Sequence, residues 1–316
     1  MEQKVPIISI CIPADKNTAY LKRLLDAVAA QTFVDYEVIV TDDSPDETVQ
    51  QFVSSYAAIK NIRYFKNTPA AGTPQNWNEA ISHAQGKWIK LMHDDDWFAH
   101  PDALQHFVEA TQQRPHCRFF FSAFQNVVQE TGAVQPVRCT QADLLFLKWS
   151  PLHLFKRVYV GNPSCTFIRR NVGLTYDRDF KFVVDFEYYI RCLRTLRHWH
   201  YIDEVLINVG FNNEQVTGYT FLRPAVQIPE NYNLLHKMGT GILHNIFVYD
   251  YYWRMHRNLC IRSVEEAQTY FGAPPPPAMQ HMIHLQQKVP LSVLQKGILS
   301  KALMLGGYLT HLLRRS

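Results

Sequence analysis

Four short apolar segments in the first 115 residues are each followed by a loop and then by a helix-like pattern. The segments are IISICI at 7–12, YEVIVT at 36–41, IRYFK at 62–66 and KWIKLM at 87–92. Each is rich in β-branched and aromatic residues, as buried strands are. Alternation of strands and helices implies right-handed crossovers and a mostly parallel sheet covered by helices on both faces. The sequence therefore predicts an open α/β architecture.

The pattern changes after about residue 117. Strands are expected at 118–128, 163–170 and 199–209, with a hairpin around Thr131 and Gly132 and a helix that begins near Asp185. Beyond residue 222 the chain is predicted to be mainly helical, and the prolines at 274–277 form a stiff spacer before a C-terminal helix. We expect one domain at 1–220 and a helical extension at 221–316.

Composition excludes several classes of protein. With 47% hydrophobic and 19% charged residues, the chain is globular, and a net charge of +4 is too small to indicate nucleic-acid binding. The six cysteines contain no CxxC pair, which argues against a zinc knuckle or a disulfide framework. No signal peptide or membrane-spanning stretch is recognisable. We expect a reduced, cytoplasmic protein.

Acidic residues follow two of the predicted strands. TDDSPDET at 41–48 follows the second strand and HDDDW at 93–97 follows the fourth. In open α/β sheets the ligand binds beyond the carboxyl ends of the strands, so both clusters are expected at one edge. Crowded carboxylates raise one another's pKa and favour a divalent cation such as Mg²⁺ or Mn²⁺. The alternatives are a solvated acidic turn and helix capping by Asp43 or Ser44.

Two further segments have both functional and ordinary interpretations. GTPQNWNEA at 72–80 places a glycine and two amides in a turn that leads into a helix, which is also common turn chemistry. Asp185 lies where a helix begins and could be its N-cap. Glu187 and Arg191 have the spacing of a helical ion pair.

In order, IISICIP, YEVIVTDDSPDET, GTPQNWNEA, KWIKLMHDDDW and VVDFEYYIR resemble the family 2 glycosyltransferases. The resemblance covers roughly residues 5–215 and implies an inverting enzyme with the GT-A fold. Such enzymes transfer a sugar from a nucleoside diphosphate to an acceptor hydroxyl, usually with Mg²⁺ or Mn²⁺. The resemblance further implies a UDP donor and a role in cell-surface polysaccharide or glycan synthesis, with a glycan or lipid-linked acceptor.

The resemblance assigns donor-binding roles to individual residues. Asp43 occupies the position of the acid that binds the base, commonly uracil, and Asp42 flanks it. Asp15 departs from the family pattern, which usually has P-T-Y-N or similar after the first strand. The expected donor-binding residues are Pro13, Asp15, Asp42, Asp43, Gly72, Asn76, Asn78, Asp94 and Asn212.

The same resemblance implies the metal ligands and the catalytic base. Asp95 and Asp96 match metal-binding acids, with Asp95 preferred, although a register that uses Asp94 and Asp96 is also open. His93 stands in the slot of the family's first acid. Asp185 matches the general base, which would take the proton of the attacking hydroxyl.

Three departures support a different class of function. His93, Val184 and Asn212 stand where the family usually has an acid, a glutamate and a histidine, which fits a non-catalytic sugar-nucleotide binder or scaffold. Retention of Asp43, Asp95 and Asp185 favours the enzyme. A nucleotidyltransferase or phosphatase would need a basic, glycine-rich loop after the first strand, and the sequence has none there.

The segment after residue 290 has the pattern of a basic amphipathic helix. Such a helix can bind the inner face of a membrane, or its apolar face can pack on the catalytic domain or on a second subunit. The apolar positions are Leu291, Leu294, Ile298, Ala302, Leu305, Leu309 and Leu312, and the basic ones are Lys288, Lys296, Lys301, Arg314 and Arg315.

Overall fold

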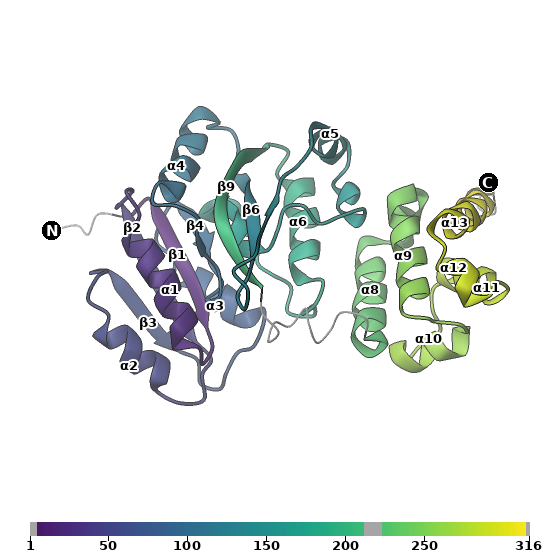
Figure 1. The fold of residues 1–316 in the computed structure, drawn as a ribbon, viewed down its shortest axis with the longest axis horizontal. Helices are drawn as coiled ribbons and strands as arrows, with labels where there is room; N and C mark the ends of the chain where they lie inside the picture. The colour runs from purple at the N-terminus through teal and green to yellow at the C-terminus, as the bar shows by residue number, and fades with distance from the viewer. Residues whose placement is uncertain (1–4, 212–222, 314–316) are drawn as a thin grey trace. The chain divides into compact units, whose positions relative to one another are not determined.

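A computed structural model describes residues 5–211 and 223–313 (Figure 1). The chain forms two compact units. The first consists of residues 1–144 and 159–213, and the second of residues 145–158 and 214–316. Residues 145–158 thus belong with the C-terminal part of the chain although they lie within the sequence of the first unit.

The first unit is built on one sheet with the strand order β3-β2-β1-β4-β8-β6-β9-β5, and β7 pairs with β6. The first four strands in this order are parallel, as predicted. Their carboxyl ends therefore lie at one edge of the sheet. The bounds are Ile8–Ala14 for β1, Tyr36–Asp42 for β2, Ile62–Lys66 for β3 and Trp88–Leu91 for β4.

The other half of the sheet is mixed. Strand β8 (Thr166–Arg169) is antiparallel to β4 and to β6 (Phe119–Val128), whereas β9 (Trp199–Phe211) is parallel to β6. The short strands β5 (Trp97–Phe98) and β7 (Val134–Val137) pair antiparallel with β9 and β6. The α/β class is confirmed, and the parallel arrangement ends where β8 enters the sheet.

Helices cover the sheet of the first unit (Figure 1). Helix α1 buries Leu21, Leu24, Leu25 and Val28, the face that its 3.6-residue spacing predicts. The side chain of Asn17 caps α1 by accepting a hydrogen bond from the Tyr20 amide. The helices are α1 (Thr18–Ala29), α2 (Thr48–Ser55), α3 (Gln75–Ser82), α4 (Ala103–Gln113), α5 (Gln141–Trp149), which crosses the boundary between units, and α6 (Val184–Thr195).

The second unit is helical, as predicted. Its helices are α8 (Pro224–Met238), α9 (Ile246–Asn258), α10 (Val264–Phe271), α11 (Pro277–Gln287), α12 (Leu291–Leu294) and α13 (Gly297–Leu313). The predicted continuous helix after residue 290 is wrong, because the chain breaks at Gln295 and Lys296 between α12 and α13. Within the described residues, no helix combines the length and apolar character that crossing a membrane requires.

The buried face of α13 is not the predicted one. Helix α13 buries Ser300, Met304, Gly307 and His311. A side chain at position 307 would come within 2.8 Å of Leu285 and 3.0 Å of the Tyr249 hydroxyl, so glycine lets α13 pack closely there. The large apolar residues of the outer face are exposed instead: Ile298, Leu299, Leu303, Leu305, Leu309 and Leu313.

Candidate active site

The acidic clusters meet at the carboxyl edge of the parallel strands. Strands β1 and β4 are neighbours, and Met92, the residue after β4, donates its backbone N–H to the Cys11 carbonyl at 2.9 Å. The Asp15 amide, just beyond β1, lies 3.4 Å from Asp94 Oδ2. The fold therefore brings the loop after β1 to the aspartate triplet that follows β4, as the sequence pattern predicts.

Asp42, at the end of β2, is fully buried. Its carboxylate accepts hydrogen bonds from Tyr64 Oη at 2.6 Å and Lys66 Nζ at 2.9 Å, and one from the Ser44 amide at 2.8 Å. Burial alone would raise the pKa of Asp42, but these hydrogen bonds outweigh it and hold the pKa below its usual value. Asp42 thus fixes the local loops and has few lone pairs left for a ligand.

Asp43 connects the end of β2 to the loop before α3. Its Oδ1 accepts hydrogen bonds from Asn67 Nδ2 at 2.7 Å and the Ala71 amide at 2.9 Å, and its Oδ2 accepts one from the Gly72 amide at 2.7 Å. The positive φ of 72° at Gly72 suits glycine. The buried Asn76 joins the same network through Asn67 and through the Ala14 carbonyl. A base that binds Asp43 must therefore share or replace these contacts.

Asn78 lies on α3 and holds a distant loop. Its amide donates to the Tyr176 carbonyl at 2.8 Å and accepts from the Tyr176 N–H at 2.9 Å. This pair of backbone contacts explains an asparagine at position 78 by structure alone. Pro13 is buried within β1, where it is paired with Thr41 of β2.

The aspartates of the triplet have different surroundings. Asp96 is fully buried, and it accepts hydrogen bonds from Asn162 Nδ2 at 2.7 Å and the Gly210 amide at 3.1 Å. Burial and the neighbouring Asp95 charge raise the pKa of both Asp94 and Asp96 to about 8. A bound cation would reverse this effect by stabilising the ionised forms.

Glycine is required at position 210 of β9. A Cβ there would lie 2.3 Å from the Asp95 carbonyl oxygen and 2.7 Å from Gln129 Nε2. The missing side chain allows β9 to pass directly against the triplet, and Gly210 can then donate its amide hydrogen to Asp96.

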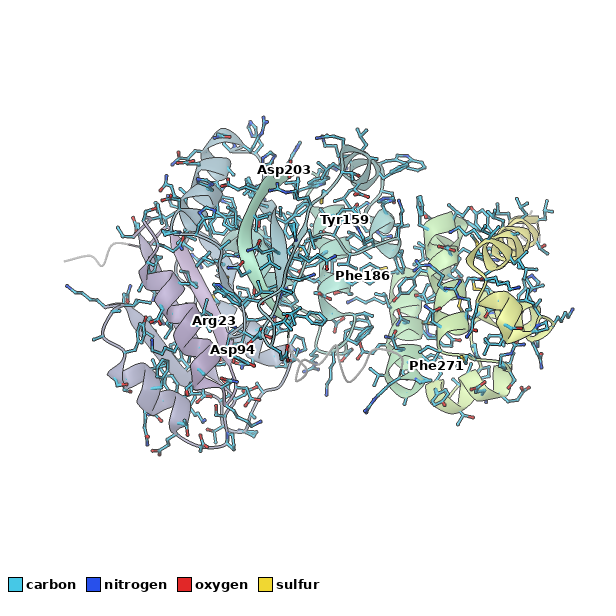
Figure 2. All side chains as sticks on the ribbon, viewed as in Figure 1. Arg23, Asp94, Tyr159, Phe186, Asp203 and Phe271 are labelled. Atoms are coloured by element: carbon cyan, nitrogen blue, oxygen red, sulfur yellow. The ribbon has the colours of Figure 1, made fainter. Side chains whose placement is uncertain are left out.

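Two cations beside the triplet were not identified from the sequence. Arg23 of α1, labelled in Figure 2, donates to the Asp95 carbonyl at 2.6 Å, and its guanidinium lies 3.8 Å from the Trp97 ring centroid. Lys90 of β4 is fully buried, and burial lowers its pKa to about 7. A lysine in an apolar strand is a visible signal in the sequence. Arg23 has no such signal, because its position on a helix surface is ordinary.

His93 completes a group of potential metal ligands. One ligand atom each from His93, Asp95 and Asp96 lies within 4.8 Å of the others. The Nε2 atom of His93 is buried and has no hydrogen-bond partner among residues 5–211 and 223–313, and burial lowers the pKa of this imidazole. Two carboxylates and a neutral imidazole suit Mn²⁺, and the carboxylates alone suit Mg²⁺. The residues present therefore fit the predicted cation.

Asp185 is the second residue of α6 and not its N-cap, which is Val183. Its Oδ1 accepts a hydrogen bond from the Phe186 amide at 2.7 Å. Burial raises the pKa of Asp185 to about 6. This value is suitable for a general base near neutral pH. Asn212, which is predicted to bind the donor, lies outside the described residues.

Aromatic contacts connect the triplet to α6. The Trp77 ring is 4.7 Å from the His93 ring and 5.1 Å from the Tyr176 ring, centroid to centroid. Tyr176 in turn stacks on Tyr188 of α6 at 4.0 Å. Tyr188 lies one helical turn after Asp185, so packed rings link the two acidic positions. The ion pair predicted between Glu187 and Arg191 is present, with a shortest N–O distance of 2.8 Å.

Comparison with known proteins identifies the family that the chain matches. The model described as glycosyl transferase family 2 matches residues 9–170, which is about half of the chain. This match includes the loops after β1, β2 and β4 and ends before Asp185.

Relatives with low sequence identity are consistent with this match. A putative colanic acid biosynthesis glycosyl transferase, WcaA of Escherichia coli K12, is 29% identical over 220 residues, which are 67% of this chain and 76% of the relative. An uncharacterized Mycobacterium tuberculosis protein is 25% identical over 203 residues. That alignment spans 60% of this chain and 62% of the relative, so the chain matches about three fifths of the relative's length.

Solved structures share the fold. Staphylococcus aureus TarS residues 1–349, in complex with UDP-GlcNAc, has a TM-score of 0.63 at 14% identity, covering 95% of this chain and 89% of that chain. The mannosyltransferase PcManGT of Pyrobaculum calidifontis, in complex with GDP-Man and Mn²⁺, has a TM-score of 0.55 at 12% identity. That match covers 99% of this chain and 89% of the other.

Proposed function

Because the chain belongs to glycosyl transferase family 2, we propose that it transfers a sugar from UDP to an acceptor hydroxyl, with inversion at the anomeric carbon. The main support is that the loops after β1, β2 and β4 bring their acids to one sheet edge, while α6 carries a separate carboxylate at Asp185. Inverting transfer needs these two kinds of site, one for the leaving diphosphate and one for the attacking hydroxyl.

The donor is assigned to the loops around Asp43 and Asp94. In this proposal Pro13, Asp15, Asp43, Gly72 and Asn76 surround the nucleotide, while Asp42 and Asn78 hold the loops in place. The existing contacts of Asp43 favour this role, because the Ala71 and Gly72 amides fix its carboxylate in position, and a uracil N–H can then share or replace one of these contacts. The choice of UDP is also supported by TarS, which was solved with UDP-GlcNAc.

A divalent cation would be held by Asp95 and Asp96, with His93 as a third ligand. When bound, it would stabilise the negative charge that develops on the departing diphosphate. Arg23 and Lys90 lie beside the same acids, so the chain itself balances part of the carboxylate charge.

Asp185 would act as the general base. Its carboxylate takes the proton of the acceptor hydroxyl as that oxygen bonds to the anomeric carbon, and the bond from this carbon to the diphosphate oxygen breaks. The diphosphate leaves with the electron pair of that bond. The raised pKa of Asp185 makes it a stronger base than an exposed aspartate, and it remains mostly ionised at neutral pH.

The acceptor is proposed to be a growing glycan or a lipid-linked glycan at the inner face of the membrane. Support comes from the exposed leucines of α13 and from the exposed Lys288 and Lys296 near them in the chain. A helix with this surface can lie in a membrane interface that contains anionic lipid. Association of two copies through the same face is the alternative, and flotation with vesicles together with sedimentation of the α13 variant distinguishes the two.

A panel of nucleotide sugars tests the proposed reaction. Thermal unfolding is measured with UDP-, GDP- and dTDP-sugars, each with Mn²⁺ and with EDTA, and the hydrolysis or transfer of each sugar is followed by nucleotide release. We expect a UDP-sugar with Mn²⁺ to raise the melting temperature and to release UDP. Stabilisation without any release, over all acceptors tried, would favour the non-catalytic binder of the same fold.

A further inference from the structure

A second group of potential metal ligands lies apart from the acid triplet, on different side chains. It consists of His100, His106 and Glu204, and one ligand atom from each lies within 4.8 Å of the others. His100 follows β5, His106 is on α4, and Glu204 is on β9. The backbone positions His100, because the neighbouring Ala99 amide donates to the Leu206 carbonyl at 2.9 Å.

The carboxylate of Glu204 lies between the two imidazoles. Its Oε2 is 2.5 Å from His106 Nδ1, and its Oε1 is 3.5 Å from His100 Nε2. The two imidazole rings are 5.5 Å apart with an angle of 66° between their planes. Ligand bonds of about 2.0–2.2 Å in a tetrahedral zinc site put ligand atoms roughly 3.3 Å apart. To surround an ion, the more distant ligand atoms, which lie within 4.8 Å of one another, must approach, and Glu204 Oε2 and His106 Nδ1, now at hydrogen-bond distance, must separate.

An irregularity in β9 aims Glu204 at this position. Along β6, Ser122 pairs with Ile202 but the next residue, Ala123, pairs with Val205. Asp203 and Glu204 are thus extra residues on β9, which form a bulge in the strand. Bulges change the direction of side chains and often lie at functional sites. Asp203 forms an ion pair with Arg138 at 2.8 Å, so the bulge separates the two acids.

We propose that His100, His106 and Glu204 form a zinc site that is separate from the candidate active site. Two imidazoles and one carboxylate are a common ligand set for Zn²⁺, with a fourth position open to water. The two histidine side chains are 32% exposed and that of Glu204 is 44% exposed, which leaves a path for the ion. The ion would join α4, β9 and the segment after β5. A site formed from three elements would stabilise the folded state, because the unfolded chain does not preserve it.

Zinc titration of the full chain tests this proposal. The measurement uses Asp95→Asn protein, so that zinc at the triplet does not dominate the signal. Calorimetry with ZnCl₂ is expected to give one site, with affinity at least tenfold lower after His106→Ala or Glu204→Gln. His284→Ala, which removes an exposed histidine of α11, is the matched control and should retain the affinity.

A spectroscopic measurement distinguishes a formed site from loose binding. Co²⁺ in a four-coordinate site of this kind gives visible absorption much stronger than hexaaqua Co²⁺, and we expect that signal in the Asp95→Asn protein but not after the further change Glu204→Gln. Equal zinc affinity in the His106→Ala, Glu204→Gln and His284→Ala proteins would overturn the proposal. His100, His106 and Glu204 would then form a hydrogen-bonded cluster that binds no metal. The same conclusion follows if zinc binds but the cobalt spectrum remains that of the hydrated ion.

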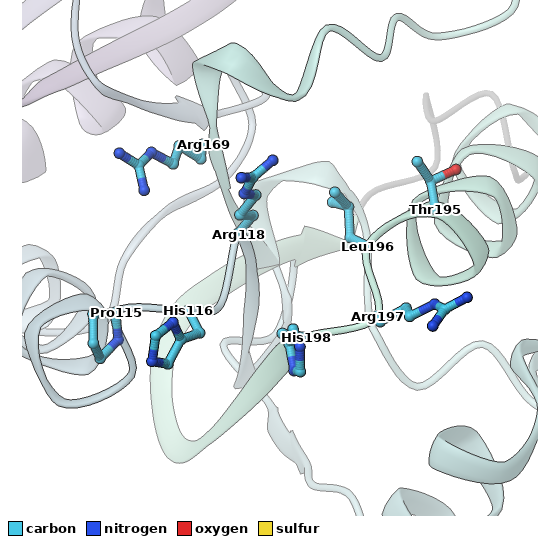
Figure 3. Close-up of a pocket in the computed structure, with 8 residues that line it drawn as sticks. All are labelled: Pro115, His116, Arg118, Arg169, Thr195, Leu196, Arg197 and His198. Atoms are coloured by element: carbon cyan, nitrogen blue, oxygen red, sulfur yellow. The ribbon is translucent and has the colours of Figure 1, made fainter.

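An independent observation concerns the opposite edge of the sheet. A cavity of about 450 Å³ opens there, and Arg118, Arg169, Arg197, His116 and His198 line it (Figure 3). Arg169 pairs with Trp88, the first residue of β4, whereas the acid triplet follows the last residue of that strand. The cavity is therefore separated from the triplet by the length of β4.

The cations of this cavity have no acidic partners in the described part of the chain. Among residues 5–211 and 223–313, no carboxylate forms an ion pair with Arg118, Arg169 or Arg197. Their strand ends are fixed, because the Arg169 amide donates to the Arg118 carbonyl at 2.9 Å and the Arg118 amide donates to the His198 carbonyl at 3.3 Å. The backbones of Arg118 and Arg169 are therefore adjacent, and an anion between two neighbouring guanidinium groups would offset their repulsion.

We infer that this cavity binds a phosphate group. Arginine presents planar, paired donors that match phosphate oxygens. Arg118 and Arg169 face each other across neighbouring strands and are the two proposed to contact the group, whereas the Arg197 side chain points away from them (Figure 3). The group could belong to a soluble phosphorylated molecule or to the headgroup of an anionic lipid. The double variant Arg118→Gln with Arg169→Gln removes two of the three arginines.

Two probes separate the sources. Binding of inorganic phosphate is measured by calorimetry, and binding to vesicles of phosphatidylcholine with and without phosphatidylglycerol by sedimentation. The control is Lys60→Gln with Arg178→Gln, which removes the same charge from exposed positions. We expect the cavity variant to bind at least fivefold more weakly than the natural chain, and the control variant to bind almost as tightly as the natural chain. If the cavity variant loses binding to anionic vesicles but not to inorganic phosphate, the ligand is a lipid headgroup. If it loses binding to inorganic phosphate, the ligand is a soluble phosphorylated molecule. Equal binding by the two variants, or no binding by the natural chain, refutes the inference.

Discussion

Arg23 donates a 2.6 Å hydrogen bond to the backbone carbonyl of Asp95, so α1 holds the middle residue of the aspartate triplet through its main chain. The guanidinium also lies 3.8 Å from the Trp97 ring centroid. Arg23 therefore positions Asp95 through the main chain without using the Asp95 carboxylate. It also places positive charge beside three carboxylates.

Replacement of Arg23 should destabilise the protein most when no cation is bound. Arg23→Met removes a charge-assisted hydrogen bond and a cation–π contact, and we expect a loss of about 2–3 kcal/mol in the free energy of unfolding. Because Mn²⁺ would also neutralise the triplet, the loss should be smaller with Mn²⁺ than with EDTA. Denaturant unfolding under both conditions checks this. A loss of the same size in both would show that Arg23 does not share its electrostatic role with a metal.

Asp95 should be required for binding of the nucleotide with its metal. We expect Asp95→Asn to weaken Mn²⁺-dependent binding of UDP at least tenfold, since an amide lacks the negative charge that a hard cation prefers. Calorimetry with UDP, with Mn²⁺ and with EDTA, measures this. Asp102→Asn is the matched control, because Asp102 lies outside the group formed by His93, Asp95 and Asp96. If EDTA does not change the affinity of the natural chain for UDP, the metal assignment is wrong.

Asp185→Asn should separate turnover from donor binding. Assistance by a general base typically contributes 10²–10⁴ in rate, so we expect turnover to fall by ~10² or more while UDP affinity changes little. The base must be ionised, and its pKa of about 6 predicts that turnover of the natural chain rises with pH and levels off above about 7. Loss of binding in proportion to rate would indicate a structural role at the start of α6.

The same substitution should change the dependence of stability on pH. The folded pKa of Asp185, about 6, lies above the ordinary aspartate value of 3.8, so the folded state binds more protons than the unfolded state between these values. Stability from this group is therefore present at low pH and lost as pH rises through that window. The asparagine side chain does not titrate, and at pH 8 the variant should be more stable by up to about 3 kcal/mol. The prediction is contradicted if the difference in stability between the variant and the natural chain moves in favour of the natural chain as the pH rises from 4 to 8.

The exposed face of α13 gives a prediction about membranes. Leu305→Gln with Leu309→Gln should reduce flotation of the full chain with vesicles that contain anionic lipid, because both side chains are exposed and contribute apolar area to the interface. The control Val34→Gln, at another exposed apolar position, should leave flotation unchanged. If the leucine variant changes the size of the protein in sedimentation and not its flotation, the face joins two copies of the chain.

The sequence was sufficient to locate most of the first unit. The segments predicted at 36–41 and 62–66 correspond to β2 and β3, because alternating strands and helices give strong local patterns. The mixed half of the sheet was harder to predict, because the pairing of β9 with β6 joins residues about 80 apart in the sequence. Sequence periodicity does not specify which strands pair. For the same reason Arg23, Gly210 and the true buried face of α13 became evident only from packing.

Gly210 has a consequence for how the chain folds during synthesis. Strands β1 to β4 lie within residues 8–91 and can form from neighbouring segments, whereas the amide that binds Asp96 arrives more than a hundred residues later. Contacts of high sequence separation form slowly, and domains begin to fold while the ribosome is still extending the chain. A nascent chain that ends at residue 170, the limit of the family match, already contains every aspartate of the triplet. Its triplet still lacks the Gly210 backbone, so the acids acquire their final surroundings only after β9 has left the ribosome and joined β6.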